Sequence, residues 1–166
     1  MVKVAFKGSP ISLYGDMPKL GQYAPLFLLT KTDLSEVDLP HFQGKRVVMN
    51  IFPSLDTPTC ANSVRAFNRE ASKLKNTVVL CISKDLPFAQ SRFCGAEGLD
   101  QVIPLSAFRD EDFGQMYGIE IADEPLHGLL ARAVIILDDE GTVIYTQLVK
   151  EITDEPDYAA ALKVLA

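Results

Sequence analysis

A continuous apolar strand, Lys45–Phe52, constrains the fold of this chain more than any other segment. Its sequence, KRVVMNIF, is apolar on both faces and is bounded by Gly44 and Pro53. Such a strand is typical of the centre of a sheet that has helices on both sides. A second strand of the same kind, Thr77–Ser83 (TVVLCIS), follows a helical stretch. The two strands and the helix between them predict a parallel βαβ unit.

The remaining segments extend this unit into a single α/β domain. A length of 166 residues fits one domain, 1–166, that buries its own core. Two short alternating stretches around Gly8-Ser9-Pro10 predict a β-hairpin, an N-terminal extension over residues 1–17. Helices are predicted at Ala61–Leu74, Pro87–Glu97, Asp110–Tyr117 and Asp157–Leu165, and further strands at Leu26–Thr30, Glu36–Leu39, Val102–Leu105, Ala133–Leu137 and Thr142–Val149. We therefore expect a mixed central sheet flanked by helices.

Composition and charge exclude several classes of function. The chain has 16 basic and 22 acidic residues, a net charge of −6, and no long basic run, which argues against nucleic-acid binding. Its longest apolar run, Ala133–Leu137, is too short to span a membrane, and its first residues lack the apolar core of a signal peptide. We expect a cytoplasmic protein, in which three cysteines serve metal binding, catalysis or redox sensing rather than structural disulfides.

Cys60 stands where a helix is predicted to begin. Thr57 followed by Pro58 is a helix-start signal, so Cys60 falls in the first turn, where unpaired N–H groups favour an anion. A thiol with a pKa of about 8.5 is only ~3% thiolate at pH 7, and lowering that pKa to about 6 requires about 3.4 kcal/mol. A helix terminus supplies at most ~2 kcal/mol. A cation must supply the rest, and spacing does not choose among Lys45, Arg46, Arg65, Arg69, Arg92, Arg109 and Arg132.

The residues around Cys60 form a longer motif. The string Pro53-Ser54-Leu55-Asp56-Thr57-Pro58-Thr59-Cys60 resembles the peroxidatic motif of the peroxiredoxins, and within them the thiol peroxidase subfamily, an atypical two-cysteine type. Further matches are Phe93-Cys94, Tyr117-Gly118-Ile119, Leu130-Ala131-Arg132-Ala133-Val134 and Glu151-Ile152-Thr153-x-Glu155-Pro156-Asp157-Tyr158, so the resemblance covers nearly the whole chain. It implies a thioredoxin-like fold in which Thr57 and Cys60 occupy the positions of a Cys-x-x-Cys pair.

The same resemblance implies a role for each residue of the site. Cys60 is the peroxidatic thiolate, and Thr57 orients the peroxide against its sulfur. Arg132 stabilises the thiolate and the charge on the leaving oxygen, and Pro53 shields the thiolate from water. Cys94 is the resolving thiol, which forms an intramolecular disulfide with Cys60 that thioredoxin reduces. The implied enzyme is a homodimer that reduces hydrogen peroxide and preferentially alkyl hydroperoxides in antioxidant defence, without a metal, haem or flavin.

Alternatives remain open from the sequence alone. Each residue also has a purely structural interpretation: Thr57 as a helix cap, Arg132 as the partner of a carboxylate, Pro53 as a strand terminator and Cys94 as a packed apolar residue. Cys81 lies inside an apolar strand and is assigned to the core. One alternative function is that of a thiol–disulfide oxidoreductase, but the chain lacks the second cysteine of a Cys-x-x-Cys pair. Another is that of a peroxide sensor, in which the same two thiols would be oxidised once without rapid recycling. We expect Cys60 and Cys94 to lie too far apart to bond in the reduced fold.

Overall fold

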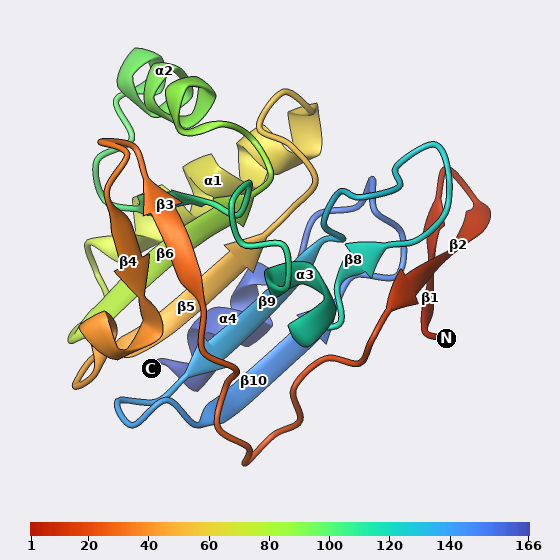
Figure 1. Ribbon diagram of the computed structural model, residues 1–166. Coiled ribbons are helices and arrows are strands. Elements are labelled where there is room, and N and C mark those ends of the chain that lie inside the picture. Colours follow the sequence, from red (N-terminus) through yellow and green to blue (C-terminus); the bar gives the residue numbers. More distant parts are fainter.

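Three parallel strands form the centre of the molecule, whose computed structural model describes residues 1–166. Strands β5 (Arg46–Ile51), β6 (Thr77–Ser83) and β7 (Ile103–Ser106) are neighbours in that order, and Figure 1 shows β5 beside β6. Every β5 residue pairs with a β6 residue in continuous register, from Arg46 opposite Thr77 to Ile51 opposite Ile82. The predicted parallel βαβ unit is therefore confirmed.

Antiparallel strands extend this centre on both sides. On one side β9 (Ala133–Leu137) pairs with β5, and β10 (Val143–Leu148) pairs with β9. On the other side β3 (Leu28–Lys31) pairs with β7, and β4 (Glu36–Asp38) pairs with β3. The result is a seven-stranded sheet in the order β10-β9-β5-β6-β7-β3-β4, which confirms the expected mixed sheet.

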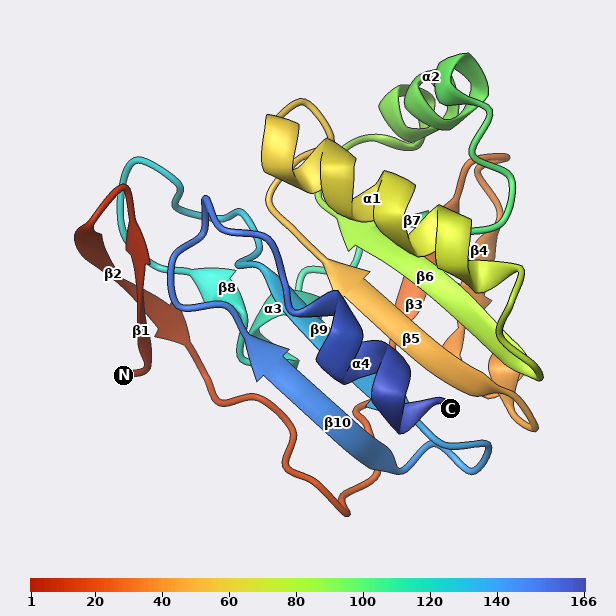
Figure 2. The same cartoon turned by 180° about the vertical axis from the view of Figure 1, so that it is seen from behind.

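Helices lie on both faces of the sheet. Helices α1 (Pro58–Ala71) and α4 (Tyr158–Val164) run along one face, as Figure 2 shows, and Phe93 joins α2 (Pro87–Glu97) to the apolar core on that side. The short helix α3 (Phe113–Met116) packs into the core on the opposite face. Helix α2 ends at Gly98, whose φ of 66° is the left-handed conformation that glycine adopts most readily. None of these helices is both long enough and apolar enough to span a membrane.

The alternation of side chains along the strands creates two separate apolar cores. On β5, Met49 faces the core on the α3 side, whereas Val48 faces the core beneath α1 and α4. Strand β9 repeats this pattern, with Ala133 toward the first core and Val134 toward the second. Because successive side chains of a strand point to opposite faces, Arg132 falls on the same side as Val134. A charged residue is thereby directed into the layer beneath α1.

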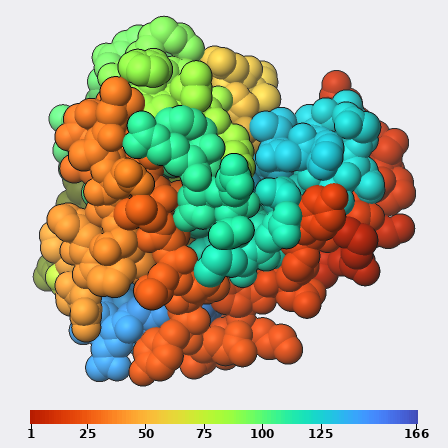
Figure 3. Space-filling model, viewed as in Figure 1, coloured from red at the N-terminus to blue at the C-terminus, as the bar shows by residue number.

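The N-terminal hairpin forms a second, smaller sheet. Strand β1 (Lys3–Phe6) pairs antiparallel with β2 (Ser9–Tyr14), and β2 also pairs with β8 (Glu120–Ile121). Figure 3 shows the N-terminal residues and those just after residue 120 in contact on one side of the molecule. Gly118 allows the chain to approach closely here, because a Cβ on it would overlap the backbone of Asp16 and Met17.

Several predicted boundaries are wrong at their ends. Helix α1 begins earlier than the predicted Ala61, since Pro58 already occupies the first helical turn. It also ends earlier than predicted, at Ala71 rather than Leu74. The predicted helix Asp110–Tyr117 is reduced to the single turn of α3. The predicted strand Glu36–Leu39 is present as β4 but ends one residue early, at Asp38, because the Asp38 carboxylate accepts a hydrogen bond from the His41 N–H and starts a 3-10 helix, η1 (Leu39–Phe42).

Candidate active site

Cys60 lies in the first turn of α1, immediately beyond the carboxyl end of β5. Thr57 has the extended conformation of a helix N-cap residue, and Pro58 starts the helix. The Cys60 side chain is directed into the core beneath α1, and the residue is 0% exposed. The first-turn position predicted for Cys60 is confirmed.

The Arg132 guanidinium contacts the Cys60 sulfur. Its Nη2 donates a hydrogen bond to Cys60 Sγ at 3.2 Å, and its Nε donates one to the Ile152 carbonyl at 2.8 Å. Arg132 is only 1% exposed, and its third nitrogen, Nη1, has no hydrogen-bond partner. Of the seven cations that spacing left open, the structure therefore brings Arg132 to the sulfur.

The pairing of Arg132 favours an anionic sulfur. A buried charge is costly unless an opposite charge or hydrogen bonds compensate it. No carboxylate lies within 4.0 Å of the Arg132 guanidinium, so the structural alternative of an Arg132–carboxylate pair does not apply. A Cys60 thiolate would neutralise the buried charge, and the N-terminus of α1 adds its own preference for an anion.

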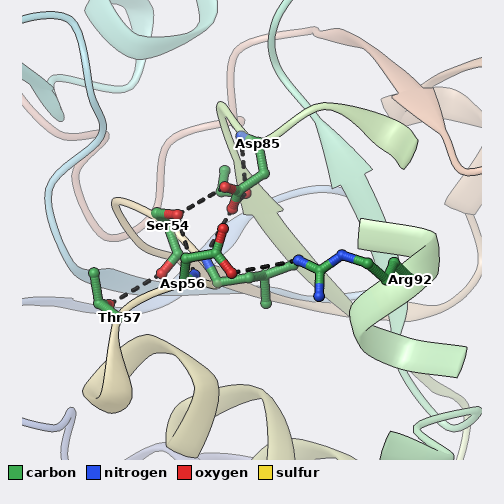
Figure 4. Close-up of polar contacts among 7 residues, drawn as sticks. Ser54, Asp56, Thr57, Asp85 and Arg92 are labelled. Carbon is green, nitrogen blue, oxygen red and sulfur yellow. Dashed lines mark hydrogen bonds and ion pairs between the residues drawn. The ribbon is translucent and has the colours of Figure 1, made fainter. Parts of the chain in front are cut away.

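The loop before α1 is held by hydrogen bonds rather than by a helix cap (Figure 4). Thr57 occupies the N-cap position, but its hydroxyl caps no helical N–H and instead donates to the Ser54 carbonyl at 3.0 Å. The Ser54 hydroxyl donates to the Asp85 carboxylate at 2.7 Å. The alternative interpretation of the Thr57 side chain as a helix cap is thus wrong, and its oxygen lone pairs stay available to a ligand. Pro53, in the same loop, is buried.

The C-terminal segment 149–153 supplies the other side of the site. Ile152 accepts the Arg132 bond through its carbonyl, and the Thr153 carbonyl accepts a hydrogen bond from the Thr59 hydroxyl at 2.9 Å. The Glu151 carboxylate accepts backbone N–H groups of Thr153, Gly8 and Lys7, and these bonds lower its pKa to about 2. Segment 149–153 is therefore fixed between the N-terminal hairpin and the Cys60 loop, by which we mean residues 53–60, the loop before α1 together with its first turn.

The other two cysteines are not joined to Cys60. Cys94 lies on α2, half-buried at the rim of the core that contains Cys60, and burial raises the pKa of its thiol. Cys81 lies inside β6, where burial raises its pKa to about 12. All three thiols are free. At neutral pH both Cys81 and Cys94 are therefore protonated.

Sequence reasoning missed the residues that act through the backbone or through the loop. Ile152 and Thr153 contribute carbonyl groups, which every residue type has, so no side-chain pattern singles them out. Asp85 offered a weak signal, because it follows the carboxyl end of a buried strand next to the one that leads to Cys60. Polar residues at such strand ends often meet at one edge of a parallel sheet.

A hollow of about 240 Å³ at the opposite end of β5 does not belong to this site. Half of its lining residues are apolar, among them Tyr23, Leu39, Phe42 and Leu137. It contains no cysteine, so it offers no redox chemistry. No group of three or more His, Cys, Asp or Glu side chains is arranged to hold a metal ion.

Comparison with known proteins places this geometry among related molecules. The family described as Redoxin matches residues 19–162. The thiol peroxidase of Mycobacterium tuberculosis is 52% identical over 165 residues, covering 99% of each chain. The structure of a peroxiredoxin-like protein from Aquifex aeolicus superposes with a TM-score of 0.92 at 40% identity, covering 98% of this chain and 95% of that one. A thiol peroxidase from Chromobacterium violaceum gives 0.91 at 25% identity, covering 98% and 94%. The expected thioredoxin-like fold is confirmed.

Proposed function

Since this chain belongs to the redoxin family, among its thiol peroxidases of the peroxiredoxin type, we propose that Cys60 is its peroxidatic nucleophile and Cys94 the resolving thiol. The protein is a thiol-dependent peroxidase, an oxidoreductase with an antioxidant function. The observation that carries the residue assignment is the buried Arg132 guanidinium against the Cys60 sulfur. A fixed cation at that place serves an anionic nucleophile.

In the first step the Cys60 thiolate attacks the nearer oxygen of a hydroperoxide. A sulfur–oxygen bond forms, the O–O bond breaks, and the departing alkoxide or hydroxide takes a proton from solvent and leaves as an alcohol or as water, respectively. Cys60 is oxidised to sulfenic acid and the hydroperoxide is reduced. The unpartnered Nη1 of Arg132 is free to donate to the peroxide oxygens, where negative charge grows as the O–O bond breaks.

Thr57 and Pro53 complete the surroundings of the sulfur. The Thr57 hydroxyl already donates to Ser54, so it accepts a hydrogen bond from the peroxide O–H and orients that group. The buried Pro53 ring keeps water from the thiolate. Full burial of Cys60 favours a narrow O–O group over a protein disulfide, which argues against a thiol–disulfide oxidoreductase.

In the second step the Cys94 thiol attacks the sulfenic sulfur, forming a disulfide and releasing water. The two cysteines lie on different helices as free thiols, Cys60 fully buried and Cys94 half-buried. We place local opening of the Cys60 loop and the C-terminal half of α2 between the two chemical steps. Local opening of a segment costs less free energy than global unfolding, and the Arg92–Asp56 ion pair that joins these two segments directly is exposed.

Recycling needs two electrons, which a dithiol supplies by exchange with the Cys60–Cys94 disulfide. Thioredoxin is the reductant that the resemblance implies, and we include it in the proposal together with a homodimeric assembly and a cytoplasmic location. We also propose a preference for alkyl hydroperoxides over hydrogen peroxide. The apolar side chains that share a core with Cys60, among them Phe52, Leu55 and Phe93, support this preference.

The test is intact mass and peptide mapping of reduced protein after one equivalent of cumene hydroperoxide. We expect the loss of two hydrogens, with Cys60 linked to Cys94 and Cys81 free. The Cys94→Ser variant should stop at Cys60 sulfenic acid and fail to turn over with thioredoxin. Normal thioredoxin-linked turnover in that variant would remove Cys94 from the mechanism, and an unmodified wild-type Cys60 would discard the nucleophile assignment.

A further inference from the structure

The Asp85 carboxylate connects the Cys60 loop to the strand that leads into α2. It accepts hydrogen bonds from the Ser54 hydroxyl at 2.7 Å and from the Leu55 N–H at 2.8 Å, both in the loop before α1. On its other side it accepts one from the Ser83 hydroxyl at 2.7 Å, at the end of β6. No cation lies within ion-pair distance of Asp85, so these donors alone stabilise its charge.

The bonds of Asp85 extend to Thr57. Ser54, which donates to Asp85, accepts the Asp56 N–H on its hydroxyl and the Thr57 hydroxyl on its carbonyl. Figure 4 shows these groups converging from the loop and from Asp85, two residues after the end of β6. The Thr57 hydroxyl, which the proposed mechanism aims at the peroxide, is therefore placed by Ser54, and Ser54 is placed by Asp85.

A second and weaker tie joins the same loop directly to α2. Arg92 Nη2 lies 3.4 Å from Asp56 Oδ1, and the two side chains are 66% and 71% exposed. Exposed pairs of this kind contribute little. Arg92 stands two positions before Cys94 on α2. The partly buried Asp85 bonds are therefore the stronger of the two ties that hold the loop.

We propose that Asp85 is a positioning residue that holds the Cys60 loop in its peroxide-reactive form and thereby sets the fate of the sulfenic acid. This inference rests on the proposed function of Cys60 and Cys94. The sulfenic acid has two competing outcomes: attack by the Cys94 thiol gives a disulfide and water, whereas a second hydroperoxide gives sulfinic acid and an alcohol. The first outcome requires the loop to leave Asp85, and the second does not.

Asp85→Asn tests this with almost no change of shape. The amide accepts through one oxygen only, so one of the three hydrogen bonds is lost or weakened. We expect disulfide formation to become about tenfold faster, the change that a loss of about 1.4 kcal/mol in the closed loop gives. Formation of sulfenic acid should become slower, because Thr57 is less well placed. The hydroperoxide concentration that over-oxidises half of Cys60 should rise about tenfold as a result.

The measurement is quenched-flow mass spectrometry with cumene hydroperoxide, which follows sulfenic acid, disulfide and sulfinic acid separately in the full-length chain. The chain contains no tryptophan, so mass is a better reporter than fluorescence. Asp139→Asn is the matched control: an exposed carboxylate at the β9–β10 turn, for which we expect unchanged rates. Ser54→Ala removes one of the same bonds and should change both rates in the same directions as Asp85→Asn, so it carries the test if Asp85→Asn does not fold.

The outcomes separate this inference from the proposed function. Faster disulfide formation together with slower oxidation supports the positioning role. A merely structural role would slow both steps, and that result, or unchanged partitioning, overturns it. A wild-type protein that never forms the Cys60–Cys94 bond overturns the proposed function, and this inference with it.

Discussion

Replacing Arg132 by methionine would separate two tasks of its guanidinium. In the native protein Nη2 donates to the Cys60 sulfur at 3.2 Å, Nε donates to the Ile152 carbonyl at 2.8 Å, and Nη1 is unpartnered. Methionine fills similar space without a charge, and folds often tolerate replacement of a buried charge by an apolar side chain. We therefore expect Arg132→Met to fold, to hold less thiolate, and to lose the donor that awaits the peroxide.

The magnitude follows from the contacts. A hydrogen bond to a charged group contributes about 1.5–3 kcal/mol. With about 1.36 kcal/mol for each factor of ten, the thiol–thiolate equilibrium should shift about 10- to 150-fold toward the thiol. Unit charges about 4 Å apart at an effective dielectric constant of about 20 interact by about 4 kcal/mol. This value is an upper bound on what the Arg132 charge contributes to the stability of the thiolate. Losing the Nη1 donor should slow O–O cleavage by a further factor of about 10²–10³.

Two assays divide these effects. Thiolate absorbance in the ultraviolet at pH 7 tests for the proposed Cys60 thiolate without a contribution from the other cysteines, because burial raises the pKa of Cys81 and of Cys94 and keeps both protonated. The rate of sulfenic acid formation reports the complete reaction. We expect the rate to fall by a larger factor than the thiolate fraction. An unchanged thiolate signal would refute the pairing of Arg132 with the thiolate, and equal factors would remove Nη1 from the transition state. Thermal unfolding checks that the variant is folded.

Three further variants test other parts of the site. Cys60→Ser should abolish peroxide consumption, whereas Cys81→Ser should leave it nearly unchanged because the Cys81 thiol is buried and protonated; equal losses would contradict these assignments. Thr57→Val should slow sulfenic acid formation by about tenfold, because one hydrogen bond of about 1.4 kcal/mol is lost. Thr57→Ser keeps the hydroxyl and should react at nearly the native rate. A valine variant as fast as the native protein would exclude a role for the hydroxyl. Glu151 has its pKa lowered from the usual 4.5 to about 2 by backbone hydrogen bonds from Thr153 and Gly8, so its charge stabilises the fold above pH 4.5 and this stability is lost as the pH falls toward 2. The difference in melting temperature between wild type and Glu151→Gln should therefore shrink over that range, and a difference independent of pH would contradict the pKa.

The central elements of the fold were predictable because local signals bound them. Strand β6 and helix α2 have the limits expected from an apolar run and from Pro87 and Gly98. Strand β8 was missed, since two residues are too few to show a period. The 3-10 helix η1 was missed because it depends on a hydrogen bond from His41 to the Asp38 side chain, which competes with a strand.

The site was predictable only for residues that are close to one another in the sequence. The sequence Thr57-Pro58 predicts a helix start by itself, and that start places Cys60 in the first turn. Arg132 is not placed in this way, because its approach to Cys60 depends on the pairing of β9 with β5 and on the pleat of β9, both long-range properties. The family resemblance selected Arg132 where spacing left seven cations open. Aspartate is common at protein surfaces, so the sequence does not single out Asp85. Its proposed role in holding the Cys60 loop follows only from its three hydrogen-bond partners.

The position of segment 149–153 has a consequence for the order in which the protein is made. Its Ile152 N–H donates to the Ala5 carbonyl at 2.9 Å, and the Ala5 N–H donates to the Lys150 carbonyl at 2.7 Å, so nearly the whole chain separates the partners. Contacts between such distant residues form late in folding. During synthesis Cys60 leaves the ribosome well before Arg132 and Ile152, so the unfinished chain holds Cys60 without the guanidinium that contacts its sulfur. Under the proposed roles of Cys60 and Arg132, reactivity toward peroxides begins only when the chain is nearly finished, and the unfinished polypeptide is spared oxidation at Cys60.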